Sequence, residues 1–360
     1  MPEPEHKLLP PPTKGHTSVA RVADDWYVVC RSKELGRRPR PITLLGIPMV
    51  VYRAEDGTAA ALLDRCPHRN VPLSMGRVRG PYLECGYHGW QFDAQGSCRA
   101  IPGLCGIVEG KGRRVAAFAC REQQGFVWVY ASPDAVPERE PHAFPYLGKT
   151  GYSSVVQTLN APGTLHATAE NALDVPHTAF LHRGLFRKDT TKRNEIQVVV
   201  KRWHDRVEAE YIGEPRPPGL FGRILAPGGG VVRHWDRFLL PSILEVEYQL
   251  GDTSHLIAAA ALTPVSDFET QLNAVISFRL PIPHWLIAPF LKPIGLRIFR
   301  QDARVLALQT SNIERFGGEQ YVSTDIDVLG NHILRLLRNA ERGDRRERDE
   351  PDEKRLEMAV

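Results

Sequence analysis

The chain has 360 residues, of which 42% are hydrophobic and 24% are charged, with 46 Lys and Arg against 42 Asp and Glu. This composition excludes a largely disordered or fibrous chain, and the length favours two domains. The formal net charge of +4 is too small to indicate nucleic-acid binding, and no apolar stretch approaches the roughly 20 residues that cross a bilayer.

The first residues do not look like a secretory signal. Residues 1–14 contain five prolines and no apolar core, so we expect a disordered lead-in over about residues 1–20 and a cytoplasmic protein. In a reducing compartment, the six cysteines are better explained as metal ligands or small core residues than as disulfides.

Short β-branched and aromatic runs then follow one another. They are separated by Gly, Pro and charged turns and cover residues 26–29, 47–52, 59–63, 115–118 and 126–130. The pattern predicts an all-β domain over residues 21–140. Proline and charge crowd residues 132–145, which predicts the connection to a second domain there.

The rest of the chain predicts an α+β domain over residues 141–342. Candidate strands at 196–203, 243–250, 256–262 and 274–280 mix with helical periodicity. A last helix is predicted over 324–342, with one apolar face made by Ile326, Leu329, Ile333, Leu336, Leu337 and Ala340. Residues 343–360 alternate charge signs, which predicts a solvated, frayed tail.

Two Cys/His pairs lie in the first domain. Cys66 and His68 are separated by sixteen residues from Cys85 and His88, so each loop offers one thiolate and one imidazole. A zinc finger groups its ligands by type, whereas this mixture suits a [2Fe-2S] cluster with two Cys ligands on one iron and two His ligands on the other. A structural zinc site, or residues that never meet, are the alternatives. Four further cysteines fit no ligand spacing: Cys30, Cys98, Cys105 and Cys120.

The ligand mixture predicts an electron relay. Because imidazole is neutral, replacing two thiolates lowers the negative charge of the cluster and raises its reduction potential, to about −150 to +300 mV.

A second group of metal-binding residue types falls within residues 170–182. Asp174 and His177 share a face if the segment is helical, but His182 lies about 140° further round, so the helix must end or bend for both histidines to converge. Two histidines and one carboxylate form the facial triad of a mononuclear Fe(II) site with open coordination positions. Spacing does not decide the third ligand, and a polar helix with one capped histidine is the alternative.

These residues carry a family resemblance. Cys66, His68, Cys85 and His88, followed by Gly89-Trp90, resemble the Rieske motif without the extra cysteine pair of respiratory Rieske subunits. Followed by the 171–182 segment, the order is similar to the large subunits of Rieske non-heme iron oxygenases over roughly residues 20–315. The resemblance implies an N-terminal all-β Rieske domain and a larger α+β catalytic domain with an antiparallel sheet and flanking helices.

The resemblance also implies residue roles. His177 and His182 become iron ligands, and Asp302 is the best match to the third ligand, with Asp325 and Asp327 as fallbacks. If Asp302 is not a ligand, it is an acid near the N-terminus of a helix. Asp174 matches the acid that links His88 of the partner subunit to the catalytic iron, which implies a homotrimer. Asn171 matches an amide near that iron.

The reductant must come from elsewhere. No G-x-G-x-x-G motif follows a strand, and the glycines at 228–230 stand alone, so we expect a ferredoxin or flavin reductase as electron donor and O2 as co-substrate. Nine Lys or Arg against four Asp or Glu between residues 65 and 122 favour an acidic donor, although ordinary solubility explains them nearly as well.

Apolar segments at 217–227 and 281–299 lie between His182 and Asp302 in sequence, the second just before Asp302. Three interpretations are open. The segments line a pocket, or they pack in an interface or core, or the second one contacts a membrane surface through Lys292, Arg297 and Arg300. The pocket interpretation predicts a monooxygenase that hydroxylates or oxidatively demethylates a large apolar substrate such as a sterol or polycyclic terpenoid. An aromatic substrate for a demethylase or ring hydroxylase is the alternative, and a pure electron-transfer protein is the alternative from another class.

Overall fold

The computed structural model describes residues 15–110, 112–182, 195–214, 232–251, 254–281, 283–344 and 350–359. The chain divides into two compact units, built mainly from Ala23–Ala143 and from Phe144–Leu262 with Asp267–Val360. Residues 1–14 of the predicted lead-in and all of the apolar segment 217–227 lie outside the described residues. For residues 15–20 the prediction of disorder is wrong, because Ser18 is buried and its amide donates to Glu319 at 2.7 Å. Within these ranges, no helix combines the length and the apolar character that a membrane crossing requires.

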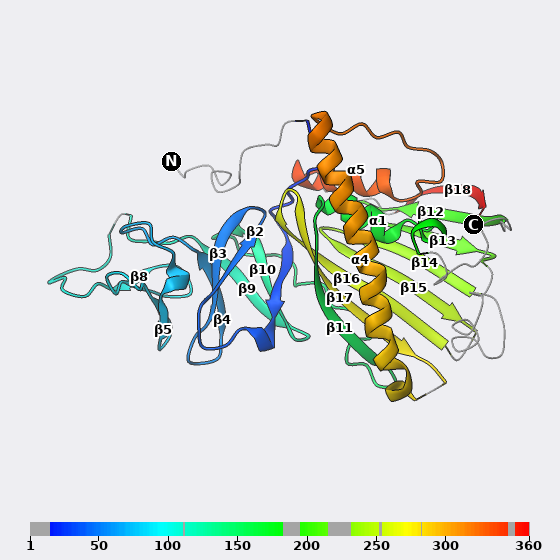
Figure 1. Ribbon diagram of the computed structural model, residues 1–360. Helices are drawn as coiled ribbons and strands as arrows, with labels where there is room; N and C mark the ends of the chain where they lie inside the picture. The colour runs from blue at the N-terminus through cyan, green and yellow to red at the C-terminus, as the bar shows by residue number, and fades with distance from the viewer. Residues whose placement is uncertain are drawn as a thin grey trace. The chain divides into compact units, whose positions relative to one another are not determined.

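The first unit is built from β-strands. A six-stranded sheet has the order β1-β10-β9-β4-β3-β2, and a four-stranded sheet has the order β5-β6-β7-β8 (Figure 1). Two short 3-10 helices, η2 (Ser32–Glu34) and η3 (Leu73–Met75), lie in the connections. The strands are β1 (Trp26–Arg31), β2 (Arg40–Leu44), β3 (Ile47–Arg53), β4 (Ala59–Leu63), β5 (Arg77–Arg79), β6 (Tyr82–Glu84), β7 (Gln91–Phe92), β8 (Cys98–Ala100), β9 (Ala117–Gln123) and β10 (Phe126–Pro133).

The larger sheet follows from its turns and its buried side chains. Leu45 and Gly46 both have positive φ and join β2 to β3 in a two-residue turn, whose twist matches that of a hairpin. Tyr27 and Val51 are fully buried in its core. The predicted strands are confirmed, although β9 begins two residues later than the predicted run. The small sheet was not predicted because its strands have only two or three residues.

The second unit is an eight-stranded sheet with the order β11-β17-β16-β15-β14-β13-β12-β18. The pairs from β18 through β12, β13, β14 and β15 to β16 are antiparallel, as is β11 with β17. The strands are β11 (Ser153–Ala161), β12 (Glu195–Arg202), β13 (Arg206–Ile212), β14 (Val232–Leu239), β15 (Ile243–Leu250), β16 (Ser254–Ser266), β17 (Glu269–Arg279) and β18 (Asp352–Ala359).

Helices cover one face of this sheet. They are α1 (Leu165–Leu173), α4 (His284–Phe316) and α5 (Gly330–Glu341). The short helix α2 (Thr178–Leu181) follows α1 and has no buried residue. Buried residues of α1, α4 and α5, such as Leu165, Leu306 and Ile333, share one apolar core with alternate residues of the strands. The expected antiparallel sheet with flanking helices is confirmed.

The last predicted helix begins later than expected, and the apolar segment 281–299 lies mostly in a helix in spite of its prolines. The helix expected over 324–342 begins only at Gly330, because the Asp327 carboxylate accepts hydrogen bonds from Thr324 and holds a turn there. Ile326 is accordingly exposed, whereas the other five predicted positions are buried. The 281–299 segment is not broken by its prolines: Pro289 and Pro293 lie inside α4, where each removes only one intrahelical donor.

The prediction of a frayed tail is wrong for its last part. Asp352–Ala359 forms β18, which pairs with β12 along its whole length. Leu356 and Met358 alternate with charged residues, so one face of the strand packs on the core while the other carries charge.

Candidate metal centres

The four Cys/His residues of the first unit lie in two turns that share the same backbone conformation and hydrogen bonding. The amide of Asn70 donates to the Cys66 carbonyl at 2.9 Å, and the amide of Gly89 donates to the Cys85 carbonyl at 3.1 Å. Both donors have positive φ, 61° and 71°. At Gly89 this conformation needs glycine, since a Cβ there would lie 2.9 Å from the Pro102 side chain.

The turns bring the predicted cluster residues together. Cys66 and Cys85 are buried, at 1% and 3% exposure, and the neighbouring Cys85 thiol helps to raise the pKa of Cys66. The rings of His68 and His88 lie 4.6 Å apart between centroids, and the Trp90 ring stacks on His68 at 4.8 Å. Two sulfur donors and two imidazoles therefore lie side by side.

The donor set fits a cationic cluster. Burial raises the pKa of Cys66 to about 11, so a thiolate there needs a bound cation to stabilise it. The buried Nδ1 of His68 has no hydrogen-bond partner among the described residues, which leaves a nitrogen available for coordination. Cys30, Cys98 and Cys120 lie in strands of this unit, in accord with their prediction as residues outside the ligand set.

In the second unit, the polypeptide breaks before the first predicted iron ligand. Helix α1 ends at Leu173, Asp174 is extended, and α2 begins after His177. Pro176 explains the break, because proline disfavours helical backbone at the preceding residue and lacks an amide donor. The predicted end of the helix is confirmed, because α2 ends at Leu181 and His182 leaves the helical conformation. The break before His177 is additional.

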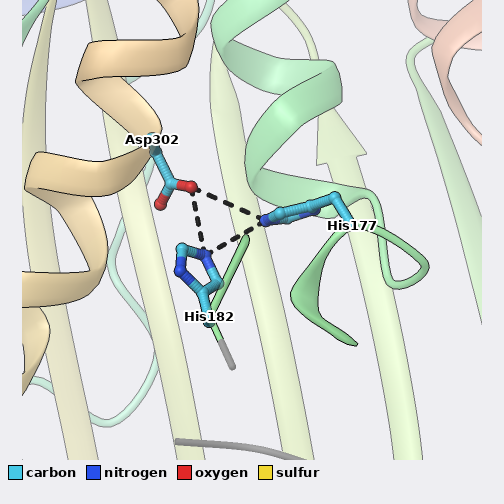
Figure 2. A group of neighbouring side chains, drawn as sticks. All are labelled: His177, His182 and Asp302. Atoms are coloured by element: carbon cyan, nitrogen blue, oxygen red, sulfur yellow. Dashed lines mark hydrogen bonds and ion pairs between the residues drawn. The ribbon is translucent and has the colours of Figure 1, made fainter. Parts of the chain in front are cut away.

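Three side chains then converge from two elements far apart in sequence. The Nε2 atoms of His177 and His182 are 3.2 Å apart. Oδ1 of Asp302, from the middle of α4, lies 3.1 Å from Nε2 of His182 and 3.6 Å from Nε2 of His177 (Figure 2). Ligand atoms that bind one cation at about 2.1 Å and at right angles are about 3 Å apart, so the spacing fits a shared metal ion.

Hydrogen bonding on the far side of the rings supports this fit. Nδ1 of His182 lies 2.9 Å from the amide oxygen of Gln301, which can only accept, so the proton of a neutral His182 is on Nδ1. Nδ1 of His177 faces the Asp174 carboxylate at 3.4 Å. Both Nε2 lone pairs and a carboxylate oxygen thus point at one another, and Asp302 Oδ1 is buried without a well-formed hydrogen bond to any described residue. Such an arrangement requires a cation or a proton between them.

The electrostatics agree. Burial lowers the pKa of His177, but the Asp174 and Asp302 carboxylates outweigh burial and raise it to about 9. Burial opposes ionisation of Asp302, but contacts with both histidines lower its pKa. A proton on His177 therefore occupies the place of a metal ion when none is bound.

The structure separates the remaining candidates. Asp302 lies mid-helix, so the interpretation as an acid at a helix N-terminus is wrong. Asp325 pairs with Lys354 at 3.0 Å and Asp327 binds Thr324, so neither fallback joins the histidines. Asn171 is half-buried on α1 and, within the described part of the chain, forms no side-chain hydrogen bond.

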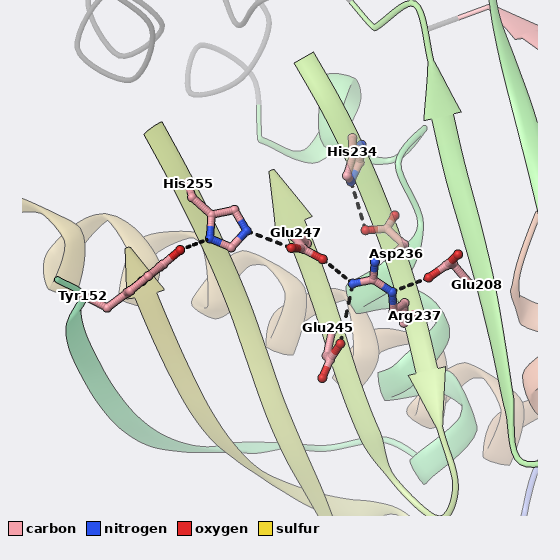
Figure 3. Close-up of polar contacts among 8 residues, drawn as sticks. All are labelled: Tyr152, Glu208, His234, Asp236, Arg237, Glu245, Glu247 and His255. Carbon is pink, nitrogen blue, oxygen red and sulfur yellow. Dashed lines mark hydrogen bonds and ion pairs between the residues drawn. The ribbon is translucent and has the colours of Figure 1, made fainter. Parts of the chain in front are cut away.

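Two polar features of this unit were not predicted. One is Gln301, which the sequence places beside Asp302 without showing its contact to His182. The other is His234, which is fully buried between two carboxylates. Its Nδ1 lies 2.7 Å from Glu214, and its Nε2 lies 2.9 Å from Asp236 (Figure 3). The rings of Tyr211 and Tyr248 stack against it.

Arg237, which follows Asp236 on β14, begins a separate network on the opposite face of the sheet. Arg237 contacts Glu208 and Glu247, and Glu247 accepts from His255, which bonds to the Tyr152 hydroxyl at 2.8 Å (Figure 3). Neighbouring strand residues point to opposite faces, which is why sequence spacing alone does not reveal either network.

Comparison with known proteins finds two families along the chain. Residues 25–110 match the Rieske [2Fe-2S] domain, and residues 164–343 match the vanillate O-demethylase oxygenase C-terminal domain. The first match contains all four Cys/His candidates, and the second contains the triad of His177, His182 and Asp302.

Curated relatives match different lengths of the chain. The oxygenase component of dicamba O-demethylase from Stenotrophomonas maltophilia is 33% identical over 187 residues, which are 50% of this chain and 53% of the relative. The chain thus spans about half the length of that relative. The vanillate O-demethylase oxygenase subunit from Pseudomonas sp. (strain HR199 / DSM 7063) is 26% identical over 365 residues, covering 87% of this chain and 92% of the relative.

Solved structures share the fold. Dicamba monooxygenase bound to 3,6-dichlorosalicylic acid matches with a TM-score of 0.75 at 24% identity and covers 90% of this chain and 99% of that chain. NdmA from Pseudomonas putida CBB5 with caffeine matches with a TM-score of 0.72 at 23% identity and covers 88% and 90%.

Proposed function

The chain belongs to the Rieske oxygenase large subunits, and from this premise we propose that it is the oxygenase component of an aromatic O- or N-demethylase. One observation carries the proposal: two imidazole nitrogens and a carboxylate oxygen converge within 4.8 Å in the same chain as the paired cysteines and histidines. An electron-transfer protein has no use for the second centre.

Each group has a role set by its position. Cys66, His68, Cys85 and His88 would hold the [2Fe-2S] cluster, and His177, His182 and Asp302 would hold Fe(II), a ligand set that leaves coordination positions open for substrate and O2. When bound, the iron supplies the activation of O2. Asp174 faces Nδ1 of His177 at 3.4 Å, which favours the proton on Nδ1 and leaves Nε2 for the metal.

The proposed reaction removes a methyl group. A methyl ether, O2, two electrons and two protons give a phenol, formaldehyde and water, and an N-methyl group gives the corresponding amine. The hydroxylated methyl carbon leaves as formaldehyde when its bond to the heteroatom breaks. The electrons come from a separate ferredoxin or flavin reductase.

The substrate class rests on the relatives and replaces the sterol or terpenoid prediction. Dicamba, vanillate and caffeine, which appear in their names, are small aromatic or heteroaromatic molecules with O- or N-methyl groups. No sterol or terpenoid appears among the relatives named above. Trp285 and Leu286, expected to line a large apolar pocket, are 65% and 45% exposed in the single chain.

Assembly and electron delivery complete the proposal. We place the transfer step between subunits of a homotrimer, with Asp174 as the bridge. A docking site for an acidic donor lies near Arg65 and Arg69, which form no salt bridge within the described ranges. Other arginines of this unit are already paired, including Arg77 with Glu84 and Arg99 with Asp93. A cytoplasmic location, and contact of α4 with a membrane surface, belong to the same proposal.

Iron content and product analysis test the function. The purified protein should hold about three irons per chain, and His177→Ala should hold about two while keeping the cluster absorption. With a reductase, the wild-type protein should release formaldehyde from methoxylated or N-methylated aromatics, and His177→Ala should release none. His332→Ala, on α5, is the matched control and should behave as wild type.

Each negative result has a distinct meaning. If the wild-type protein holds only about two irons per chain, and His177→Ala transfers electrons as fast as wild type, the protein is a pure electron carrier. Oxygenation of a sterol but of no aromatic would overturn the substrate class and leave the oxygenase intact.

A further inference from the structure

Helix α4 approaches His182 with two consecutive side chains. Asp302 contacts Nε2 at 3.1 Å, and Gln301 contacts Nδ1 at 2.9 Å. Successive helical residues project about 100° apart, so the two side chains reach opposite sides of one imidazole ring. We infer that Gln301 is the positioning residue that sets the proton and the orientation of His182 for metal binding. This inference rests on the proposed function.

The chemistry of the amide makes the contact directional. Gln301 Oε1 accepts but cannot donate, so it favours the tautomer with the proton on Nδ1 and leaves the lone pair on Nε2. A ring flip about the Cβ–Cγ bond would remove this bond and turn Nε2 away from Asp302. Because the His182 side chain is 2% exposed, water is poorly placed to replace the amide oxygen.

Two other contacts of His182 do not fix the ring in the same way. Its backbone amide donates to the Thr178 carbonyl at 3.2 Å, which holds the main chain at the end of α2. The contact with His177 is to Nε2, the atom expected to bind metal. Only a partner at Nδ1 distinguishes the two ring orientations while leaving Nε2 open.

The two iron-ligand histidines therefore have different supports. His177 has the Asp174 carboxylate, whereas His182 has a neutral amide. Partners of this kind change metal affinity by roughly ten- to a hundredfold when they are lost. Gln301 supplies orientation at His182 without adding a second negative charge behind the histidines.

Metal titration separates positioning from packing. The protein is prepared with its cluster, the mononuclear site is emptied with a chelator, and Co(II) binding is followed by its visible absorption. Gln301→Asn keeps the amide but shortens the side chain by one methylene, and Gln301→Met keeps the length without the amide. Both should weaken Co(II) binding by roughly ten- to a hundredfold. Gln301→Glu keeps length and acceptor and should stay within about threefold of wild type.

Controls make the outcomes distinguishable. Gln157→Asn alters another glutamine that contacts α4, through the Lys292 carbonyl at 3.3 Å, and should not change Co(II) affinity. Wild-type protein should bind Co(II) at a site that is lost in Asp302→Ala. If no such Asp302-dependent binding is seen, the proposed function fails. If the wild-type protein does bind and both Gln301→Asn and Gln301→Met bind equally well, or if Gln301→Glu binds as weakly as they do, the role of Gln301 is overturned. Cluster absorption and melting temperature report folding, and either weakening variant suffices if the other fails to fold.

Discussion

Oδ2 of Asp174 lies 3.4 Å from Nδ1 of His177, while Nε2 of the same ring faces Asp302 at 3.6 Å. One imidazole thus connects two carboxylates through its two nitrogens. In the metal-free protein this arrangement retains a proton that a metal ion must displace.

Metal binding should therefore depend on pH in a defined direction. His177 has a raised pKa of about 9 when no metal is bound, so below that pH its proton competes with the cation. Apparent affinity for Co(II) should rise by up to about tenfold per pH unit toward pH 9 and then level off. Titrations in buffers of different ionisation enthalpy should show about one proton released near pH 6.5, falling to about half a proton near pH 9. Asp174→Asn should shift the rise to lower pH, and equal affinity throughout the range would contradict this account.

Replacing Asp174 should affect electron transfer more than metal content. Asp174→Asn keeps the shape but removes the charge beside His177. We expect mononuclear iron to be retained, turnover to fall by roughly ten- to a hundredfold, and the cluster to remain reduced for longer in the presence of O2 and substrate. Asp205→Asn, in the turn between β12 and β13, should leave both rates unchanged. Rapid oxidation of the cluster in Asp174→Asn would remove Asp174 from the transfer path.

The cysteines should separate into ligands and bystanders. Cys66→Ser and Cys85→Ser each remove a buried thiol of the candidate cluster site and should abolish the Rieske absorption and electron paramagnetic resonance signals. The exposed Cys105 is the natural control, and Cys105→Ser should keep both signals. A cluster that survives the loss of Cys85 would show that these turns do not bind it.

The buried imidazole of β14 should make stability pH-dependent. Burial lowers the pKa of His234, but Asp236 and Glu214 raise it to about 10, above the ordinary value of 6.5. The interaction of protonated His234 with Asp236 and Glu214 therefore stabilises the fold fully below about pH 6.5, and this contribution is lost as the pH rises toward 10. His234→Gln leaves buried carboxylates without their cation, which should cost about 3–5 kcal/mol at neutral pH and flatten the decline of melting temperature between pH 7 and 10. His332→Gln is the control, and an unchanged slope in His234→Gln would assign the pH dependence to other groups.

Truncation of two neighbouring residues of β18 should change the free energy of unfolding by very different amounts. Met358 is 4% exposed and packs in the core, whereas Glu357 points outward. Met358→Ala should cost about 2–5 kcal/mol in the free energy of unfolding, and Glu357→Ala less than about 0.5 kcal/mol. Denaturant titration measures both. Two neutral substitutions would mean that the C-terminal segment is frayed after all.

Local spacing carried the prediction of the metal ligands. In the first unit the four candidates lie in two turns, so C-x-H and C-x2-H describe most of their geometry. In the second unit, the H-x4-H pair was visible, and Pro176 signalled the break. Asp302 came from the family resemblance, because a single acid on a long helix has no local signature.

Tertiary partners were beyond the reach of these patterns. The Gln301 contact joins residues 119 positions apart, and His234 is paired with Glu214 from outside its own strand. The last strand was missed for another reason: its charge suggested solvent on all sides, while Leu356 and Met358 already showed the alternation of a half-buried strand.

A long span of chain separates His182 from Asp302 on α4, so a metal ion bound by both would affect the stability of everything between them. A cation bound by both ends closes this span, which contains most of the eight-stranded sheet, in the manner of a removable crosslink. Because a ligand that binds only the folded state stabilises it, iron starvation should shorten the lifetime of this unit against proteases. The abundance of the protein in a cell would then follow iron supply even where its synthesis is constant.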